Sequence, residues 1–251
     1  MASVALAPTE LGTEKIGKLL KMYAVPGIIA QTAASLYNMV DSIYIGHIPG
    51  VGSAAISGLA VTFPLMNLAT AMGTLVGVGA TTLISVLLGQ KNYDTARKVL
   101  SNVLSLNLII GALFSGVTLA FLDPILRFFG ASDVTLPFAR DYMLIILIGN
   151  VFTHLYFGFN GLIRASGHPK TAMGLTLFTV ISNAVLDPVF IFVFEMGIRG
   201  AALATVICQM AALVYTMKFF LDKKNLLHFP KPMFQIDWRI AGYPAIGWGL
   251  S

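Results

Sequence analysis

The chain has 251 residues, of which 57% are hydrophobic and only 11% are charged, and its mean hydropathy is +0.82. Soluble domains carry about 25% charged residues, so this composition excludes an ordinary water-soluble fold and favours a protein embedded in lipid. The formal net charge of +5 does not indicate nucleic-acid binding, because the lysines and arginines lie between long apolar runs rather than in one basic patch.

The N-terminal segment and the cysteine content argue against a cleaved signal peptide and an intrachain disulfide. Residues 1–14 lack the basic start, short apolar core and cleavage site of a signal peptide, and we expect them to form a cytoplasmic tail. Cys208 is the only cysteine, so an intrachain disulfide is excluded.

Six apolar stretches follow the tail, each long enough to cross a hydrocarbon layer of about 30 Å as a helix. The second contains Pro64 and is long for a single crossing, so we expect it to tilt or bend. We therefore predict an all-α membrane protein, a bundle of six transmembrane helices within residues 15–221. The predicted crossings are residues 22–46, 55–88, 99–122, 142–163, 171–194 and 201–221.

The lysines and arginines indicate the orientation, since short cytoplasmic loops of membrane proteins are enriched in both. With the N-terminus inside, 13 of the 16 cations fall on the cytoplasmic side, and the excess persists loop by loop. This pattern predicts a multi-pass protein with a cytoplasmic N-terminus. The three cations on the outer side are Arg127, Arg140 and Arg199.

The sequence after the sixth stretch changes character. Residues 222–238 are polar and contain Pro230 and Pro232, which is typical of a linker, here on the cytoplasmic side. Residues 239–251 begin a seventh apolar stretch that offers about 12 residues where a crossing needs about 20. We therefore expect an incomplete seventh helix at 239–251.

Two acidic residues alone lie within the predicted crossings, Asp41 and Asp187. At 1.5 Å per residue they lie roughly 30 and 26 Å above the cytoplasmic cations Lys21 and Lys170, so the two helices carry them to a similar depth. No lysine or arginine lies at that depth to neutralise them. A buried carboxylate is costly unless it is protonated or paired with a cation. The pair therefore predicts a site for a coupling ion, H⁺ or Na⁺.

Polar neighbours on the same helix faces favour this interpretation. Asn183 precedes Asp187 by four residues, and Tyr37 and Asn38 precede Asp41 by four and three. Their oxygens are ligands that Na⁺ could use. A single intramembrane aspartate can instead be a structural hydrogen-bond acceptor, and this alternative is weaker for two acids at matched depth.

Two prolines and a threonine complete the predicted set. Pro188 and Pro26 have no amide hydrogen, so the carbonyls of Ala184 and Met22 lose their usual helical partners and become ion ligands or bending points. Thr205 lies six residues inward from Arg199, on the crossing that enters from the outer side, where its hydroxyl can reach the same layer.

The remaining motifs are less specific. Gly73 and Gly77 are spaced for close helix contact, although glycine is common in membrane helices. His154 in the fourth crossing is ambiguous between packing and function. The sequence has no HExxH, phosphate-binding loop or zinc-spaced Cys/His cluster, and neither aspartate has the Gly-Asp element of intramembrane proteases, so we do not expect an enzyme or a cofactor.

An ordered set of motifs extends over about residues 14–235. The motifs are Pro26, Tyr37-Asn38-Met39-Val40-Asp41, Ile45-Gly46, Gly77-Val78-Gly79-Ala80, Leu88-Gly89-Gln90-Lys91, Ala96-Arg97, Arg164-Ala165-Ser166-Gly167, residues 183–188 and residues 197–205. Taken together, this set resembles the multidrug and toxic compound extrusion (MATE) transporters. The resemblance implies a plasma-membrane (inner-membrane) antiporter that exports small organic compounds, often cationic or amphipathic, as H⁺ or Na⁺ enters.

The resemblance also implies roles for individual residues. The family's N-lobe cation site falls on Asp41, Asn183, Asp187 and Thr205, with Na⁺ as one occupant. The residues implied to line the substrate cavity are Gln31, Tyr37, Asn38 and, as a weaker match, Asn160.

The chain departs from the family in length, because the family has twelve crossings in two lobes. We therefore expect a second six-helix lobe as a missing partner, besides the lipid bilayer and a small organic substrate. Two alternatives remain. One is a lipid-linked oligosaccharide flippase of related fold, which should carry basic residues in its cavity. The other is a half-length fragment that does not transport.

Overall fold

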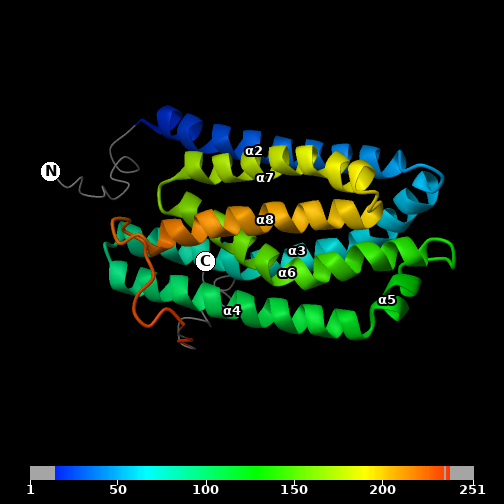
Figure 1. Cartoon of the computed structure of the whole chain (residues 1–251). Helices are drawn as coiled ribbons and strands as arrows, with labels where there is room; N and C mark the ends of the chain where they lie inside the picture. The colour runs from blue at the N-terminus through cyan, green and yellow to red at the C-terminus, as the bar shows by residue number, and fades with distance from the viewer. Residues whose placement is uncertain (1–14, 235, 238–251) are drawn as a thin grey trace.

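The structure is a computed structural model that describes residues 15–234 and 236–237. Within these residues every regular element is helical (Figure 1). The predicted tail at 1–14, the end of the linker at 238 and the predicted seventh helix at 239–251 lie outside the described residues. The elements are α2 (Ile16–Gly46), α3 (Gly52–Gly89), α4 (Tyr93–Ala120), α5 (Leu122–Phe128), α6 (Leu136–Ala165), α7 (Pro169–Pro188), the π-helical turn η1 (Val189–Val193) and α8 (Ile198–Leu221).

Six of these helices are long and lie side by side, which confirms the predicted six-helix bundle (Figure 1). Helix α2 packs mainly against α7, and α6 lies in the middle, against α3, α4, α7 and α8. Helix α4 begins at Tyr93, six residues before the predicted crossing at 99–122, and Asn92 caps it by accepting a hydrogen bond from the amide of Thr95 at 3.3 Å. Its first turns are polar, so an apolar pattern could not reveal them.

Five helices in the described residues are long and apolar enough to cross a membrane, namely α3, α4, α6, the continuous α7–η1 stretch and α8. Helix α2, predicted as the first crossing at 22–46, has 31 residues but does not reach that apolarity. The reason is its polar inner face, since Gln31, Asn38, Asp41 and Ser42 all line a cavity.

Glycines bring α3 and α6 into very close contact, as predicted for Gly73 and Gly77. A Cβ atom added to Gly77 would lie 2.8 Å from the Cα of Gly158, and one added to Gly73 would lie 2.8 Å from the His154 ring. Such distances leave no room for a side chain. The two helices can therefore approach backbone to backbone only because these positions are glycine.

The segment after α8 packs against the bundle. Leu227 and Phe229 are buried in the hydrophobic core at this end of the helices, where Phe229 lies near the rings of Phe159 and Phe220. The amide of Phe229 donates to the carbonyl of Phe220 at 2.9 Å. Residues 222–229 therefore form part of the folded lobe, although their composition predicted only a linker.

The end of this segment is held by α4. The side chain of Asn102 donates to the carbonyl of Asp237 at 3.1 Å and accepts from the Asp237 amide at 2.8 Å. Asn102 is buried and Asp237 is half-buried, so both bonds are partly shielded from water. The side chain of Arg97 also donates to the carbonyl of Leu226 at 3.3 Å. The path of the chain across this end of the bundle is thus fixed at two places.

At the opposite end the short helix α5 lies across the bundle, in a region that the sequence predicted only as an outer loop. All three arginines predicted outside form ion pairs there with exposed or half-exposed carboxylates. The pairs are Arg127 with Asp133 at 2.9 Å, Arg140 with Asp123 at 3.3 Å and Arg199 with Asp141 at 2.8 Å.

Candidate functional site

The two aspartates singled out by the sequence come together between α2 and α7. Asp41 is 5% exposed and Asp187 is fully buried, and their carboxyl groups lie close enough to interact directly. One oxygen of Asp41 and both oxygens of Asp187 have no hydrogen-bond partner in the described part of the chain. Burying unpaired carboxylates costs several kcal/mol each. The pair is therefore a candidate site for a proton or a metal cation.

Helical spacing places the companions of each aspartate. Asn183 lies one turn before Asp187 on α7, on the same helix face, while Tyr37 lies one turn before Asp41 on α2. Helix α7 ends at Pro188, and the chain continues as a π-helical turn of five residues. A change of helical register next to a buried charge is a frequent feature of functional sites.

Thr205 joins the three helices at this point. Its hydroxyl lies 2.9 Å from the hydroxyl of Tyr37 on α2, and it accepts a hydrogen bond from the side-chain nitrogen of Asn183 on α7 at 3.3 Å. These contacts turn the side-chain oxygen of Asn183 away from Thr205, and that oxygen is buried without a partner within the described residues. Asp41, Asn183, Asp187 and Thr205 thus form one cluster.

The cluster has the donor chemistry of a small-cation site. Carboxylate, amide and hydroxyl oxygens are hard ligands of the kind that bind Na⁺ or accept a proton. Within residues 15–234 and 236–237 no group of three or more His, Cys, Asp and Glu side chains is arranged to hold a metal ion. A Na⁺ site here would therefore depend on two carboxylates completed by Asn183 and Thr205.

An open cavity of about 520 Å³ adjoins the cluster, and Asp41, Tyr37 and Thr205 are part of its wall. Gln31 and Asn38, predicted for substrate binding, also line it. Its other walls are formed by α3, α6 and α8. The polar residues there that the sequence analysis missed are Asn67, Thr70, Asn150, Thr153 and Gln209.

These missed residues carried a detectable signal. Asn67 and Thr70 on α3, and Asn150 and Thr153 on α6, are each three residues apart and therefore share one helix face. Thr153 also donates a hydrogen bond to the side-chain oxygen of Gln209 on α8. A polar pair within an apolar helix marks a face turned away from lipid, and this spacing could have predicted the cavity wall.

The structure does not bring Asn160 to this cavity. Its side chain donates to the carbonyl of Ala172 at 3.2 Å and accepts from Arg164 at 3.5 Å, which ties α6 to α7. It lines a separate cavity of about 150 Å³ between α6, α7 and α8, whose wall includes Tyr37 and Thr205 as well. Asn160 is therefore adjacent to the aspartate cluster but outside the larger cavity.

The two predicted bending points differ in position. Pro26 is buried inside α2, and the helix continues through it from Ile16 to Gly46. It lies 15 residues, or roughly 22 Å along the helix axis, from Asp41. Pro188 immediately follows Asp187 and is the last residue of α7. Only Pro188 therefore belongs to the site itself, and bending at either proline stays a prediction.

His154 lies apart from the cluster, at the crossing of α3, α4 and α6. It is fully buried, and neither ring nitrogen has a hydrogen-bond partner among the described residues. A Cβ atom on Gly111 of α4 would lie 3.2 Å from its Nδ1. Its ring fills space that the glycines leave, so packing accounts for its position.

Relatives of known activity cover most of the chain. The MatE family model matches residues 26–189. The chain is 31% identical over 210 residues to the multidrug export protein MepA of Staphylococcus aureus (strain NCTC 8325 / PS 47), covering 84% of this chain and 46% of that protein. It is 32% identical over 214 residues to MepA of Staphylococcus haemolyticus (strain JCSC1435), covering 85% and 47%. The chain thus spans about half the length of these relatives.

Solved structures agree with the fold. The MATE multidrug transporter DinF-BH superposes with a TM-score of 0.86 at 32% identity, covering 94% of this chain and 53% of that one. A MATE transporter in the bent conformation has a TM-score of 0.80 at 25% identity, covering 87% and 48%. From these matches we conclude that the chain belongs to the MATE family and corresponds to its N-terminal lobe.

Proposed function

We propose that this chain is the ion-coupled half of a multidrug exporter, which moves small organic cations or amphipathic compounds out of the cell as H⁺ or Na⁺ enters. The observation that carries the proposal is the aspartate pair. Asp41 and Asp187 come from different helices, face each other without a basic partner in the described residues, and adjoin an open cavity. Such a pair is stable only when a cation or a proton occupies it.

The lining of the cavity supports a cationic or amphipathic cargo. Besides amides and hydroxyls it presents four aromatic rings, those of Tyr37, Phe63, Tyr142 and Phe157, and its one acidic side chain is Asp41. Aromatic faces attract cations and bind flat apolar groups. The described lining residues include no lysine or arginine, which argues against a flippase for pyrophosphate-linked lipids.

Coupling follows from the shared position of Asp41. Its carboxyl group belongs to the aspartate pair and also to the cavity wall, so a bound ion changes the charge that the cargo meets. An inward-moving ion that neutralises the pair weakens the hold on a cationic cargo, and release of the ion restores it. We further propose that α2 bends near Pro26 as this charge changes, with the register change after Pro188 as the opposite hinge.

Transport by alternating access needs two bodies that move about a shared site. The relatives are about twice as long as this chain, and we propose that a second six-helix lobe provides the other wall of the cavity. We place the lobe in the plasma membrane with its N-terminus in the cytoplasm, because 13 of the 16 lysines and arginines then lie inside. A half-length chain that binds ion and cargo without transporting them is the second candidate, since it needs only the residues described here.

Binding to the purified chain tests the ion site without requiring a second lobe. A fluorescent lipophilic dye cation is titrated and followed by fluorescence anisotropy, over a range of pH and of Na⁺ at constant ionic strength. We expect H⁺ or Na⁺ to weaken dye binding in the wild type. Asp41→Asn and Asp187→Asn should abolish that ion dependence. Asp94→Asn, which neutralises an acid with a 91% exposed side chain, should preserve it.

Efflux separates the two candidates. Cells that express the chain with and without the second half of a MepA-type relative are loaded with the dye, and its loss is recorded. Efflux only with the second half supports the two-lobe exporter, and binding without efflux in either case favours the non-transporting alternative. The ion-coupling proposal fails if both asparagine variants bind dye with the wild-type dependence on H⁺ and Na⁺.

A further inference from the structure

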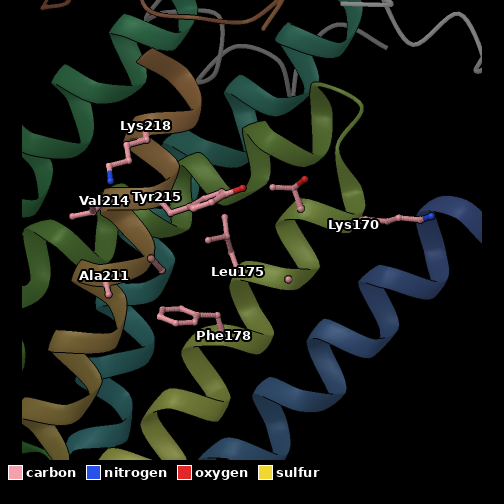
Figure 2. A pocket seen from close by; sticks show the side chains of 10 residues that line it. Lys170, Leu175, Phe178, Ala211, Val214, Tyr215 and Lys218 are labelled. Atoms are coloured by element: carbon pink, nitrogen blue, oxygen red, sulfur yellow. The ribbon is translucent and has the colours of Figure 1, made fainter. Parts of the chain in front are cut away.

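A second open groove, of about 630 Å³, lies between α7 and α8 on the outside of the bundle (Figure 2). It is separate from the aspartate cluster, since the two share no lining residue. Lys170 and Lys218 lie on its opposite edges, and Phe178 lies further along α7. The groove is thus basic at one end and apolar along the rest of its length.

The apolar part faces away from the rest of the protein. Phe178 and Val214 are 47% and 56% exposed, and only 17% of the apolar window of the α7–η1 stretch is buried. Small residues give the groove its width, because a Cβ atom on Gly174 would meet no atom within 4 Å. In a membrane-spanning lobe this surface is in contact with acyl chains.

The polar end lies at the depth of lipid headgroups. Lys170 is in the first turn of α7 and Lys218 in the last turn of α8, and Phe178 is eight residues, or roughly 12 Å, deeper. The hydroxyl of Tyr215 points across the groove toward α7, where Thr171 also belongs to the lining (Figure 2). Lys170 and Lys218 therefore border one end of an apolar channel, with their side chains extending outward from it (Figure 2), and Tyr215 and Thr171 add two hydroxyls at that end.

The charges of these lysines are not neutralised within the protein. The three arginines at the other end of the bundle each pair with an aspartate, whereas Lys170 and Lys218 form no ion pair with any residue in the described ranges. The described lining of the groove includes no acidic side chain. Unpaired ammonium groups at the membrane surface attract anionic lipid headgroups.

We propose that this groove binds one anionic phospholipid of the cytoplasmic leaflet. The phosphate lies between Lys170 and Lys218 and accepts hydrogen bonds from Tyr215 and Thr171, while an acyl chain follows Phe178 and Val214 into the membrane. The proposal depends on the placement of this end of the lobe in the cytoplasmic leaflet. The lipid site does not depend on the aspartate pair, so no result of the dye-binding experiment above can support or contradict it.

Native mass spectrometry of the purified chain tests the proposal with phosphatidylglycerol and phosphatidylcholine of identical acyl chains. We expect one tightly retained phosphatidylglycerol and weaker retention of phosphatidylcholine. The double variant Lys170→Gln/Lys218→Gln should bind phosphatidylglycerol roughly thirtyfold more weakly, at about fivefold for each lysine near the membrane surface. The matched control Lys223→Gln/Lys224→Gln removes the same charge from exposed positions in the turn after α8, and we expect it to bind as the wild type does.

A third variant tests the apolar half of the groove. Gly174→Leu fills the channel, keeps both lysines and favours the helical state, so its effect cannot be attributed to lost charge or to unfolding. We expect it to weaken phosphatidylglycerol binding as well. Unchanged binding in Gly174→Leu together with full competition by inorganic phosphate would reveal a simple anion site and overturn the proposal.

Two further results would also overturn it. Equal affinity for the two lipids would remove the role of headgroup charge. Cross-linking of the Val214→Cys variant to a second copy of the chain, in the presence of excess phosphatidylglycerol, would make the groove an interface between proteins. Far-ultraviolet circular dichroism of each variant confirms that the bundle is intact.

Discussion

The contact between α3 and α6 at Gly77 leads to the most specific stability prediction. Gly77→Ala adds a methyl group whose carbon would lie 2.8 Å from the Cα of Gly158 and 3.2 Å from its carbonyl oxygen. Ordinary contacts between carbon atoms lie near 3.5–4.0 Å, so the helices must separate by about 1 Å. The obstacle is backbone, and no side-chain rotation can relieve it.

Overpacking of this kind costs about 1–3 kcal/mol, and the higher helix propensity of alanine returns up to about 1 kcal/mol. We expect a net destabilisation of about 1–2 kcal/mol for Gly77→Ala. The assay is thermal unfolding of the purified chain in detergent, followed by circular dichroism. The matched control is Gly116→Ala near the C-terminal end of α4, where an added Cβ would meet no atom within 4 Å. That variant should be as stable as the wild type or more stable.

The unfolding temperatures of the two alanine variants test whether the backbones of α3 and α6 are in contact at Gly77. If Gly77→Ala unfolds at the same temperature as Gly116→Ala, the backbone contact between α3 and α6 is not as close as described. The contact also sets the distance between two cavity walls, since Asn67 lies on α3 and Asn150 on α6. A folded Gly77→Ala variant should therefore also show altered affinity for the dye cation, which Gly116→Ala should not.

Three other changes have distinct expected results. Asn102→Ala removes both hydrogen bonds to Asp237. We expect limited proteolysis to cut this variant faster within residues 222–237, and we expect its unfolding free energy to fall by about 1–3 kcal/mol. A wild-type cleavage rate would show that these two bonds do not hold the segment. Thr205→Val leaves the hydroxyl of Tyr37 and the side-chain nitrogen of Asn183 without their shared partner. We expect this variant to lose about 1–3 kcal/mol of stability in thermal unfolding. The control Thr82→Val, at an exposed position, should lose less than about 0.5 kcal/mol. The pair of Arg199 and Asp141 is exposed, so a double-mutant cycle should give a coupling energy below about 1 kcal/mol, and a larger value would contradict the assignment of this pair to the surface.

The sequence was sufficient to predict a similar depth for Asp41 and Asp187, because the rise of a helix fixes depth along the membrane normal. The long apolar stretches likewise sufficed for the six-helix bundle, since a hydrocarbon layer leaves few other ways to satisfy backbone hydrogen bonds. Both inferences use the coordinate along the helix axis. That coordinate is set locally, by residue count alone.

The neighbour that a helix face meets could not be predicted in the same way. Thr153 and Asn160 are seven residues apart and share one face of α6, yet Thr153 contacts Gln209 on α8 beside the cavity, whereas Asn160 contacts the carbonyl of Ala172 on α7. Which neighbour each face meets depends on how α6 packs among four other helices. The docking of Leu227 and Phe229 was missed for a related reason, because two apolar side chains in a polar segment are visible only once the core that receives them is known.

The low apolarity of α2 and the position of the aspartate pair have one physical explanation. Helix α2 is at the edge of the bundle, packs mainly against α7 and has little contact with α8, and the only apolar residues it buries among those described are Pro26, Ala30 and Ile45. Two polar connections compensate, the hydroxyl contact between Tyr37 and Thr205 and the facing carboxyl groups of Asp41 and Asp187. The first is attractive in any state, whereas the second repels when both groups are charged and attracts when a proton or Na⁺ lies between them. Under the proposed function, the coupling ion therefore acts on the helix that the rest of the packing restrains least.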